Sequence, residues 1–312
     1  MRKYFLTLTI IGALLMLSCH SKNTDKNAAN TLRSGYIKIA VDETLADVIK
    51  QEVDVFEALY PANIDIINTT ESNAIELLKI DTVRLAVAAR PLTEAEISYF
   101  NKKTYYPKSI RVAIDAIAVI THPGNPDSII NLQNLKKILT GEAKNWNEIY
   151  PSSKLGKIQV VFDNTNSSIV RYAMDSICKD KPMSTELNAL DLNKQVVEYV
   201  AKTPNAMGFI GVSLISNEKD SISVDFTRKI QVMSVSKADK PDKKNSFQPY
   251  QYYMYTMQYP LTRNIYILLN DPRGELPKGL TNFIAGDKGQ RIIKSAGLLP
   301  VTMPVNQVVI TR

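Results

Sequence analysis

Three stretches of hydroxyl, amide and carboxyl side chains stand where a predicted strand gives way to a predicted helix. They are residues 41–44, 69–73 and 162–168. Helix N-termini present unpaired N–H groups and the positive end of the helix dipole, so they suit small anions, and Ser and Thr add O–H donors. Each stretch alone is equally typical of an ordinary N-cap. Because open α/β sheets bind ligands at the carboxyl ends of their strands, the three together predict an anion site.

Signatures of catalysis are missing from the sequence. It contains no Gly-x-Ser-x-Gly, His-Glu-x-x-His, Walker or dinucleotide-binding motif. Only two His and two Cys are present, too few for a Cys/His zinc centre or a disulfide framework. We therefore expect no enzyme, no metal and no cofactor. The basic run at 237–246 comes without a nucleic-acid-reading motif, so it predicts a solvated loop and no nucleic acid partner.

Strand and helix patterns alternate along the chain, which predicts an α/β protein whose sheets are largely parallel and covered by helices on both faces. The apolar run at 110–121 is long for a strand and could pass from one domain into another. The length of the chain is near the size at which one core divides into two. Strands are expected at 36–41, 63–68, 84–89, 110–121, 157–162, 206–212, 229–234 and 263–269, and helices at 44–60, 72–80, 93–101, 132–139, 167–178, 194–201 and, as a pair broken near Gly286, 280–295.

The N-terminus predicts export. Arg2 and Lys3 precede an apolar run that ends at Cys19, which resembles a bacterial lipoprotein signal. We expect residues 1–18 to be the signal peptide, Cys19 to carry the lipid, and residues 19–35 to be a flexible tether. The protein would then lie on the periplasmic or cell-surface side, anchored to a membrane. An ordinary secretory signal or an uncleaved anchor is the alternative, and the remaining Cys178 is expected to be a small buried residue.

Four segments resemble the phosphate-binding proteins of ABC transporters, the PstS-like branch of the type 2 periplasmic binding fold. They are a helix–Gly–Trp segment at 132–149, a strand at 202–210, a Tyr-Pro-Leu-Thr-Arg strand at 258–266 and a C-terminal segment at 283–300.

The resemblance, which runs from about residue 36 to the end, implies a two-lobed α/β fold. Each lobe would be a mostly parallel sheet flanked by helices, and hinge strands would join the two. Lobe 1 would comprise 36–115 plus 231–312, and lobe 2 would comprise 116–230.

The resemblance also implies a set of ligand contacts, with departures from the family pattern. Glu71 opens a stretch that keeps only the Ser of Gly-Ser-Gly-Gly, Asp163 stands where the family has Arg, and Arg90 stands where it has an acid. Arg90 and Arg171 would restore positive charge, since guanidinium matches oxyanions. Arg90 is equally able to pair with Glu94 or Glu96. The expected ligand-binding residues are Thr44, Leu45, Ser72, Asn73, Arg90, Asn166, Ser167, Ser168 and Arg171.

We therefore expect a monomeric lipoprotein that captures phosphate or a similar small oxyanion. It would deliver the anion to the membrane subunits of an ABC importer. Two alternatives stay open: a scaffold or sensory lipoprotein with the same fold, and an extracytoplasmic hydrolase of phosphate esters.

Overall fold

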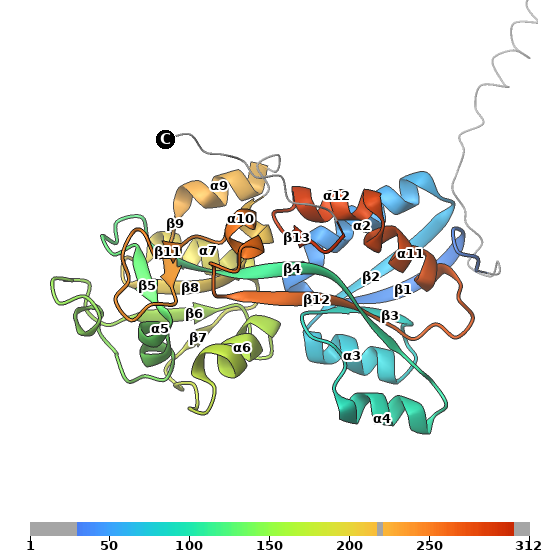
Figure 1. The fold of residues 1–312 in the computed structure, drawn as a ribbon, viewed down its shortest axis with the longest axis horizontal. Helices are drawn as coiled ribbons and strands as arrows, with labels where there is room; N and C mark the ends of the chain where they lie inside the picture. Colours follow the sequence, from blue (N-terminus) through green and yellow to red (C-terminus); the bar gives the residue numbers. More distant parts are fainter. Residues whose placement is uncertain (1–29, 217–220, 303–312) are drawn as a thin grey trace, which may run out of the picture.

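The computed structural model describes residues 30–216 and 221–302. The expected signal peptide at 1–18, the expected lipidation at Cys19 and the tether up to residue 29 lie outside the described residues. Figure 1 shows two groups of elements side by side, connected by two long strands that run across the middle. Within the described ranges, no helix combines the length and the hydrophobicity that crossing a bilayer requires.

The first group is built on parallel strands in the order β2-β1-β3. Almost every residue of β1 is buried, as expected for a parallel strand with helices on both faces. Helices α2, α11 and α12 cover one face, and α3 and α4 cover the other (Figure 1). The elements are β1 (Gly35–Asp42), the 3-10 turn η2 (Glu43–Leu45), α2 (Ala46–Leu59), β2 (Ala62–Thr69), α3 (Glu71–Lys79), β3 (Leu85–Ala88), α4 (Glu94–Lys102), α11 (Leu276–Ala285), α12 (Asp287–Ser295) and β13 (Leu299–Pro300).

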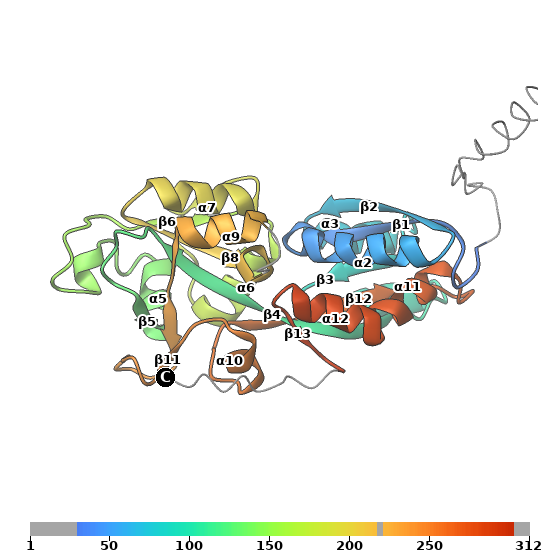
Figure 2. The same cartoon turned by 90° about the horizontal axis from the view of Figure 1, so that it is seen from above.

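Two antiparallel strands, β4 (Lys108–Thr121) and β12 (Thr262–Leu269), join the groups. The first part of β4 pairs with β12, and its last five residues pair with β8 of the second group. Seen from above in Figure 2, β4 passes from one group into the other. The long apolar strand expected at 110–121 therefore does cross between the two sheets.

The second group is built on parallel strands in the order β8-β6-β7, with a smaller sheet β11-β10-β5 beside it. The helix expected at 167–178 starts as α-helix and continues as a π-helix. The elements are β5 (Ile129–Asn131), α5 (Leu132–Leu139), the 3-10 turn η3 (Trp146–Glu148), β6 (Gln159–Phe162), α6 (Ser168–Tyr172), the π-helix η4 (Ala173–Cys178), β7 (Asn188–Ala189), α7 (Asn193–Lys202), β8 (Ala206–Gly211), α8 (Ser213–Ser216), α9 (Ser221–Lys229), β9 (Gln231–Val232), β10 (Ser234–Ser236), β11 (Ser246–Phe247) and α10 (Gln251–Tyr255).

The protein is thus α/β with mixed sheets. Each group has a run of three parallel strands, and β10 also pairs parallel with β5 in the smaller sheet, whereas β12 and β4 run antiparallel to their neighbours. In place of the one strand expected at 229–234 there are two short ones: β9 pairs with β4, and β10 pairs with β5. These pairings keep the chain in the second group beyond residue 231, and β12 carries it back.

Candidate functional site

The guanidinium of Arg263 lies where the two groups of elements meet. Its Nε and Nη2 each lie 2.9 Å from Oδ2 of Asp115. Nη1 donates to Ser168 Oγ at 2.7 Å, and Nη2 donates to Thr44 Oγ1 at 2.9 Å. All four residues are buried. One cation therefore holds hydroxyl groups from both halves of the molecule, and the two hydroxyl oxygens are 3.2 Å apart.

Local structure explains why these side chains meet. Arg263 and Asp115 are cross-strand partners on β12 and β4, so the strands that join the halves also fix the ion pair. Thr44 is held in η2, whose N-cap Asp42 accepts a hydrogen bond from the Thr44 N–H at 3.0 Å. Ser168 is the first residue of α6, after the N-cap Ser167. Cap chemistry thus places both hydroxyls at the N-terminal end of a helical turn.

Carboxyl groups outnumber cations around this centre. Asp42 and Asp163 are fully buried. Glu43 on η2 accepts a hydrogen bond from Asn164 across the seam, the boundary between the two halves. Burial, with a contribution from the charge of Asp42, raises the pKa of Asp163 to about 6, although a hydrogen bond with Ser167 opposes this effect. Burial, followed by the charges of Asp163 and Asp42, raises the pKa of Glu43 to about 7. Burial also raises the pKa of Asp42, although Arg263 opposes this effect.

Three acids around Arg263 each have one oxygen that lacks a hydrogen-bond partner in the described part of the chain. These oxygens are Asp42 Oδ2, Asp115 Oδ1 and Asp163 Oδ1. A buried polar atom without a partner is costly, so these atoms favour either a proton or a donor from a guest. An anion at this centre would be repelled by the carboxyl groups unless some of them carry a proton.

A second cluster joins the halves nearby, around the buried carboxylate of Glu71. Its Oε2 lies 2.5 Å from Arg171 Nε, and its Oε1 accepts the Ala89 N–H at 2.8 Å. Arg90 Nε lies 3.6 Å from the same carboxylate. Both terminal nitrogens of Arg90 donate to Glu96, each at 2.8 Å, and this contact raises the pKa of Arg90. The sequence left two roles open for Arg90: contact with a ligand, or an ion pair with Glu94 or Glu96. The structure contains the ion pair, and the acid is Glu96.

The structure separates the expected ligand-binding residues into three sets. Thr44 and Ser168 meet at Arg263, and Leu45 and Ser167 are buried next to them in the chain. Arg90 and Arg171 meet at Glu71. The remaining three side chains are exposed, and no hydrogen bond joins them to a side chain of either cluster in the part of the chain that the structure describes: Ser72, Asn73 and Asn166.

Sequence reasoning missed Arg263, Asp115 and Glu71 as site residues. Arg263 stands inside the Tyr-Pro-Leu-Thr-Arg segment, and Asp115 is an acid in the apolar part of a long strand. A buried charge inside such a strand requires a partner of opposite sign. The acid in this apolar run could therefore have indicated a buried ion pair. In the ranges that the structure describes, no group of three or more His, Cys, Asp or Glu is arranged to hold a metal ion.

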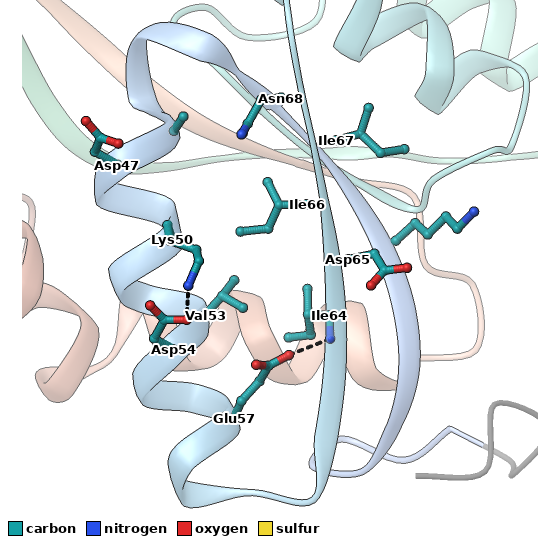
Figure 3. A pocket seen from close by; sticks show the side chains of 12 residues that line it. Asp47, Lys50, Val53, Asp54, Glu57, Ile64, Asp65, Ile66, Ile67 and Asn68 are labelled. Carbon is teal, nitrogen blue, oxygen red and sulfur yellow. Dashed lines mark hydrogen bonds and ion pairs between the residues drawn. The ribbon is translucent and has the colours of Figure 1, made fainter. Parts of the chain in front are cut away.

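A separate groove of about 640 Å³ lies between α2 and the edge strand β2 (Figure 3). Several of its polar groups already have partners, some of them outside the groove: Asp47, for example, pairs with Lys194 at 3.5 Å. Lys50 pairs with Asp54 along the helix, and Glu57 accepts the Ile64 N–H at 2.6 Å. None of the residues expected to bind a ligand lines this groove, so the candidate site is the pair of clusters between the halves.

The chain belongs to the PBP superfamily: the sequence profile of the PBP superfamily domain matches residues 26–288. Its relatives include the phosphate-binding protein PstS of Pseudomonas aeruginosa, 22% identical over 289 residues, which covers 87% of this chain and 85% of the relative. PstS of Borreliella burgdorferi is 26% identical over 231 residues, covering 70% and 72%.

Solved structures agree on the fold. A putative phosphate ABC transporter substrate-binding protein from Clostridium perfringens, crystallised with bound phosphate, superposes with a TM-score of 0.71 at 20% identity, covering 86% of this chain and 100% of that chain. An ABC-type phosphate transport receptor from Vibrio cholerae gives a TM-score of 0.65 at 19% identity, covering 85% and 100%. The chain is thus a distant homologue of phosphate-binding proteins and has their type 2 periplasmic binding architecture.

Proposed function

We propose that this protein captures an inorganic oxyanion, phosphate by analogy with its relatives, and presents it to the membrane subunits of an ABC importer. The observation that carries the proposal is the convergence of Thr44 and Ser168, from opposite halves, on the Arg263 guanidinium. Two hydroxyl donors and a guanidinium at two helical N-termini form a set of donors suited to a small anion. The protein binds and releases its ligand without performing chemistry on it.

In this proposal the halves are lobes that close about β4 and β12 as hinge strands. The strand pairings favour a second lobe that extends to about residue 260 rather than to 230. The bound anion would take the place of the direct contact between Thr44 and Ser168. Lipid attachment at Cys19, a position on the outer side of a membrane and a monomeric state complete the proposal.

Binding should weaken as the pH rises. Glu43 and Asp163 titrate at about 7 and about 6, so they are largely neutral below this window and negatively charged above it. Sulfate keeps a constant charge between about pH 5 and pH 8, so the pH dependence of its binding reports the protein alone. We expect isothermal titration calorimetry to show at least about tenfold tighter binding of sulfate at about pH 5 than at about pH 8, because each ionised carboxylate repels the anion. Equal affinity at both values would remove these two acids from the site.

The location of the site is tested with two serine variants titrated with phosphate. Ser168→Ala removes a hydroxyl that contacts Arg263, whereas Ser72→Ala removes an exposed hydroxyl at the start of α3. We expect phosphate to bind Ser168→Ala roughly tenfold or more weakly than the wild type, which is what one hydrogen bond to a charged group contributes. Binding in Ser72→Ala should match that of the wild type. The reverse pattern would move the site to the α3 terminus.

One observation favours a second candidate, a scaffold or sensory lipoprotein that has kept the fold without transport. The nitrogens of Arg263 already have partners within the protein, so the centre is satisfied without a guest. This candidate predicts no heat of binding with phosphate, sulfate, molybdate or a small dicarboxylate at any pH.

A further inference from the structure

Glu71 is an anion that the protein places inside its own cation cluster. It opens α3, yet its side chain is only 2% exposed. Its two carboxylate oxygens meet Arg171 Nε at 2.5 Å and Nη2 at 3.3 Å, the Ala89 N–H at 2.8 Å and Arg90 Nε at 3.6 Å. One carboxylate thus receives two guanidinium groups and a main-chain N–H. Such donors are typical of a binding site for an oxyanion or a carboxylate ligand.

The partners come from different parts of the fold. Arg171 lies on α6 in the second half, whereas Ala89 and Arg90 follow β3 in the first half. Arg171 also donates to the Ala89 carbonyl at 3.3 Å, so its guanidinium extends across the seam. Glu71 therefore bridges the two halves in the way a bound ligand would.

The surrounding charges show what the cluster lacks without Glu71. Arg90 is paired with Glu96, and Arg171 has a second contact with Asp175 at 3.2 Å, on a side chain that is 61% exposed. With Glu71 neutralised, Glu96 and Asp175 are the acids that would remain paired with the two arginines among the described residues. The buried position between the guanidiniums would then be open to an anion from solution.

We propose that Arg171, Arg90 and the Ala89 N–H form a receptor for a small oxyanion or carboxylate, which Glu71 fills in this structure as an internal competitor. This inference rests on the proposed function, because Glu71 would compete with the anion that the protein is proposed to capture between its two halves. An incoming anion must displace the Glu71 carboxylate. The apparent affinity is then reduced by the fraction of molecules in which Glu71 occupies the receptor.

A matched pair of variants tests the proposal. Glu71→Gln keeps the size of the side chain and removes its charge, whereas Asp175→Asn removes an exposed negative charge beside the same Arg171. We expect phosphate and acetate, titrated separately by calorimetry, to bind Glu71→Gln at least about tenfold more tightly than the wild type. Asp175→Asn should stay within about threefold of the wild type, since a mostly exposed ion pair contributes little.

Small-angle scattering supplies a readout that does not depend on affinity. The wild type should be closed without ligand, so phosphate should leave its radius of gyration unchanged. Glu71→Gln should be more extended without ligand and should contract when phosphate is added. A variant that is as compact as the wild type and binds phosphate no more tightly would overturn the inference. If Glu71→Gln does not fold, Glu71→Ser, which leaves the capping residue Thr70 in place and supplies a short uncharged side chain after it, is subject to the same expectations.

The two proposals fail differently. If the wild type binds phosphate through Ser168 and Glu71→Gln changes nothing, the internal competitor is excluded and the proposed function stands. If only Glu71→Gln binds phosphate, the competitor is supported and the wild type is held in an occupied state. If neither protein binds any anion, both proposals are wrong.

Discussion

Replacing Arg263 with Met is expected to lower the free energy of unfolding by about 3–5 kcal/mol, the range for removing one partner of a buried ion pair. Arg263 is 4% exposed and Asp115 is completely buried. Without the guanidinium, the Asp115 carboxylate loses its partner, and the Thr44 and Ser168 hydroxyls lose a charged donor. Urea denaturation followed by circular dichroism would measure the change.

The loss of stability comes from the Asp115 charge that is left without a partner, and not from the absence of the arginine side chain itself. Adding Asp115→Asn to Arg263→Met should therefore recover much of the stability, since the double variant no longer leaves the Asp115 carboxylate buried without its counter-charge. Arg84→Met serves as the control: its pair with Asp81 spans 3.6 Å between side chains that are 32% and 43% exposed. That variant should change stability by less than about 1 kcal/mol. If Arg263→Met is as mild as Arg84→Met, the pair does not hold the seam together.

Predictions from periodicity worked where an element buries one continuous face. The helix expected at 44–60 occurs as η2 and α2, with Val48, Ile49, Val53 and Phe56 buried on one side. The crossing strand and the helix pair broken at Gly286 were confirmed for the same reason. Short elements such as β9 and β10 were misjudged because their strand partners, not their own residues, decide where they begin and end.

The candidate site was predictable where it depends on local chemistry. The positions of Thr44 and Ser168 at helix starts were predictable, because hydroxyls there follow from cap preferences within a few residues. The Arg263–Asp115 pair joins positions 148 residues apart, and the Glu71–Arg171 pair joins positions 100 apart. Nothing in a local pattern brings such partners together; only the strand order and the closure of the two halves do so.

Glu52→Gln is expected to remove much of the loss of stability that the protein suffers as the pH rises. Glu52 lies on the buried face of α2, is completely inaccessible, and neither carboxyl oxygen has a hydrogen-bond partner among the described residues. Burial raises the pKa of Glu52 to about 9, from an ordinary value of 4.5. In the folded protein the group therefore keeps its proton up to that pH, whereas in the unfolded chain it ionises above the ordinary value.

The sign of the effect follows from this difference in proton binding. Below the ordinary pKa both states are protonated and stability is complete. As the pH rises toward about 9, only the unfolded state releases the proton, so wild-type stability falls by about 1.4 kcal/mol per pH unit. Glu52→Gln cannot ionise, so its advantage over the wild type should grow to roughly 4 kcal/mol between about pH 5 and pH 8.

Urea denaturation at several pH values, with wild type and variant compared at each, isolates this group from the other titrating acids. Asp54→Asn is the matched control, because it removes a carboxylate from the same helix on a side chain that is 51% exposed. An exposed carboxylate stays hydrated on folding, so the control should show no advantage that grows with pH. A Glu52→Gln curve that runs parallel to the wild type would mean that Glu52 ionises in the folded protein. In that case a proton donor or a cation must reach it on the covered side of α2.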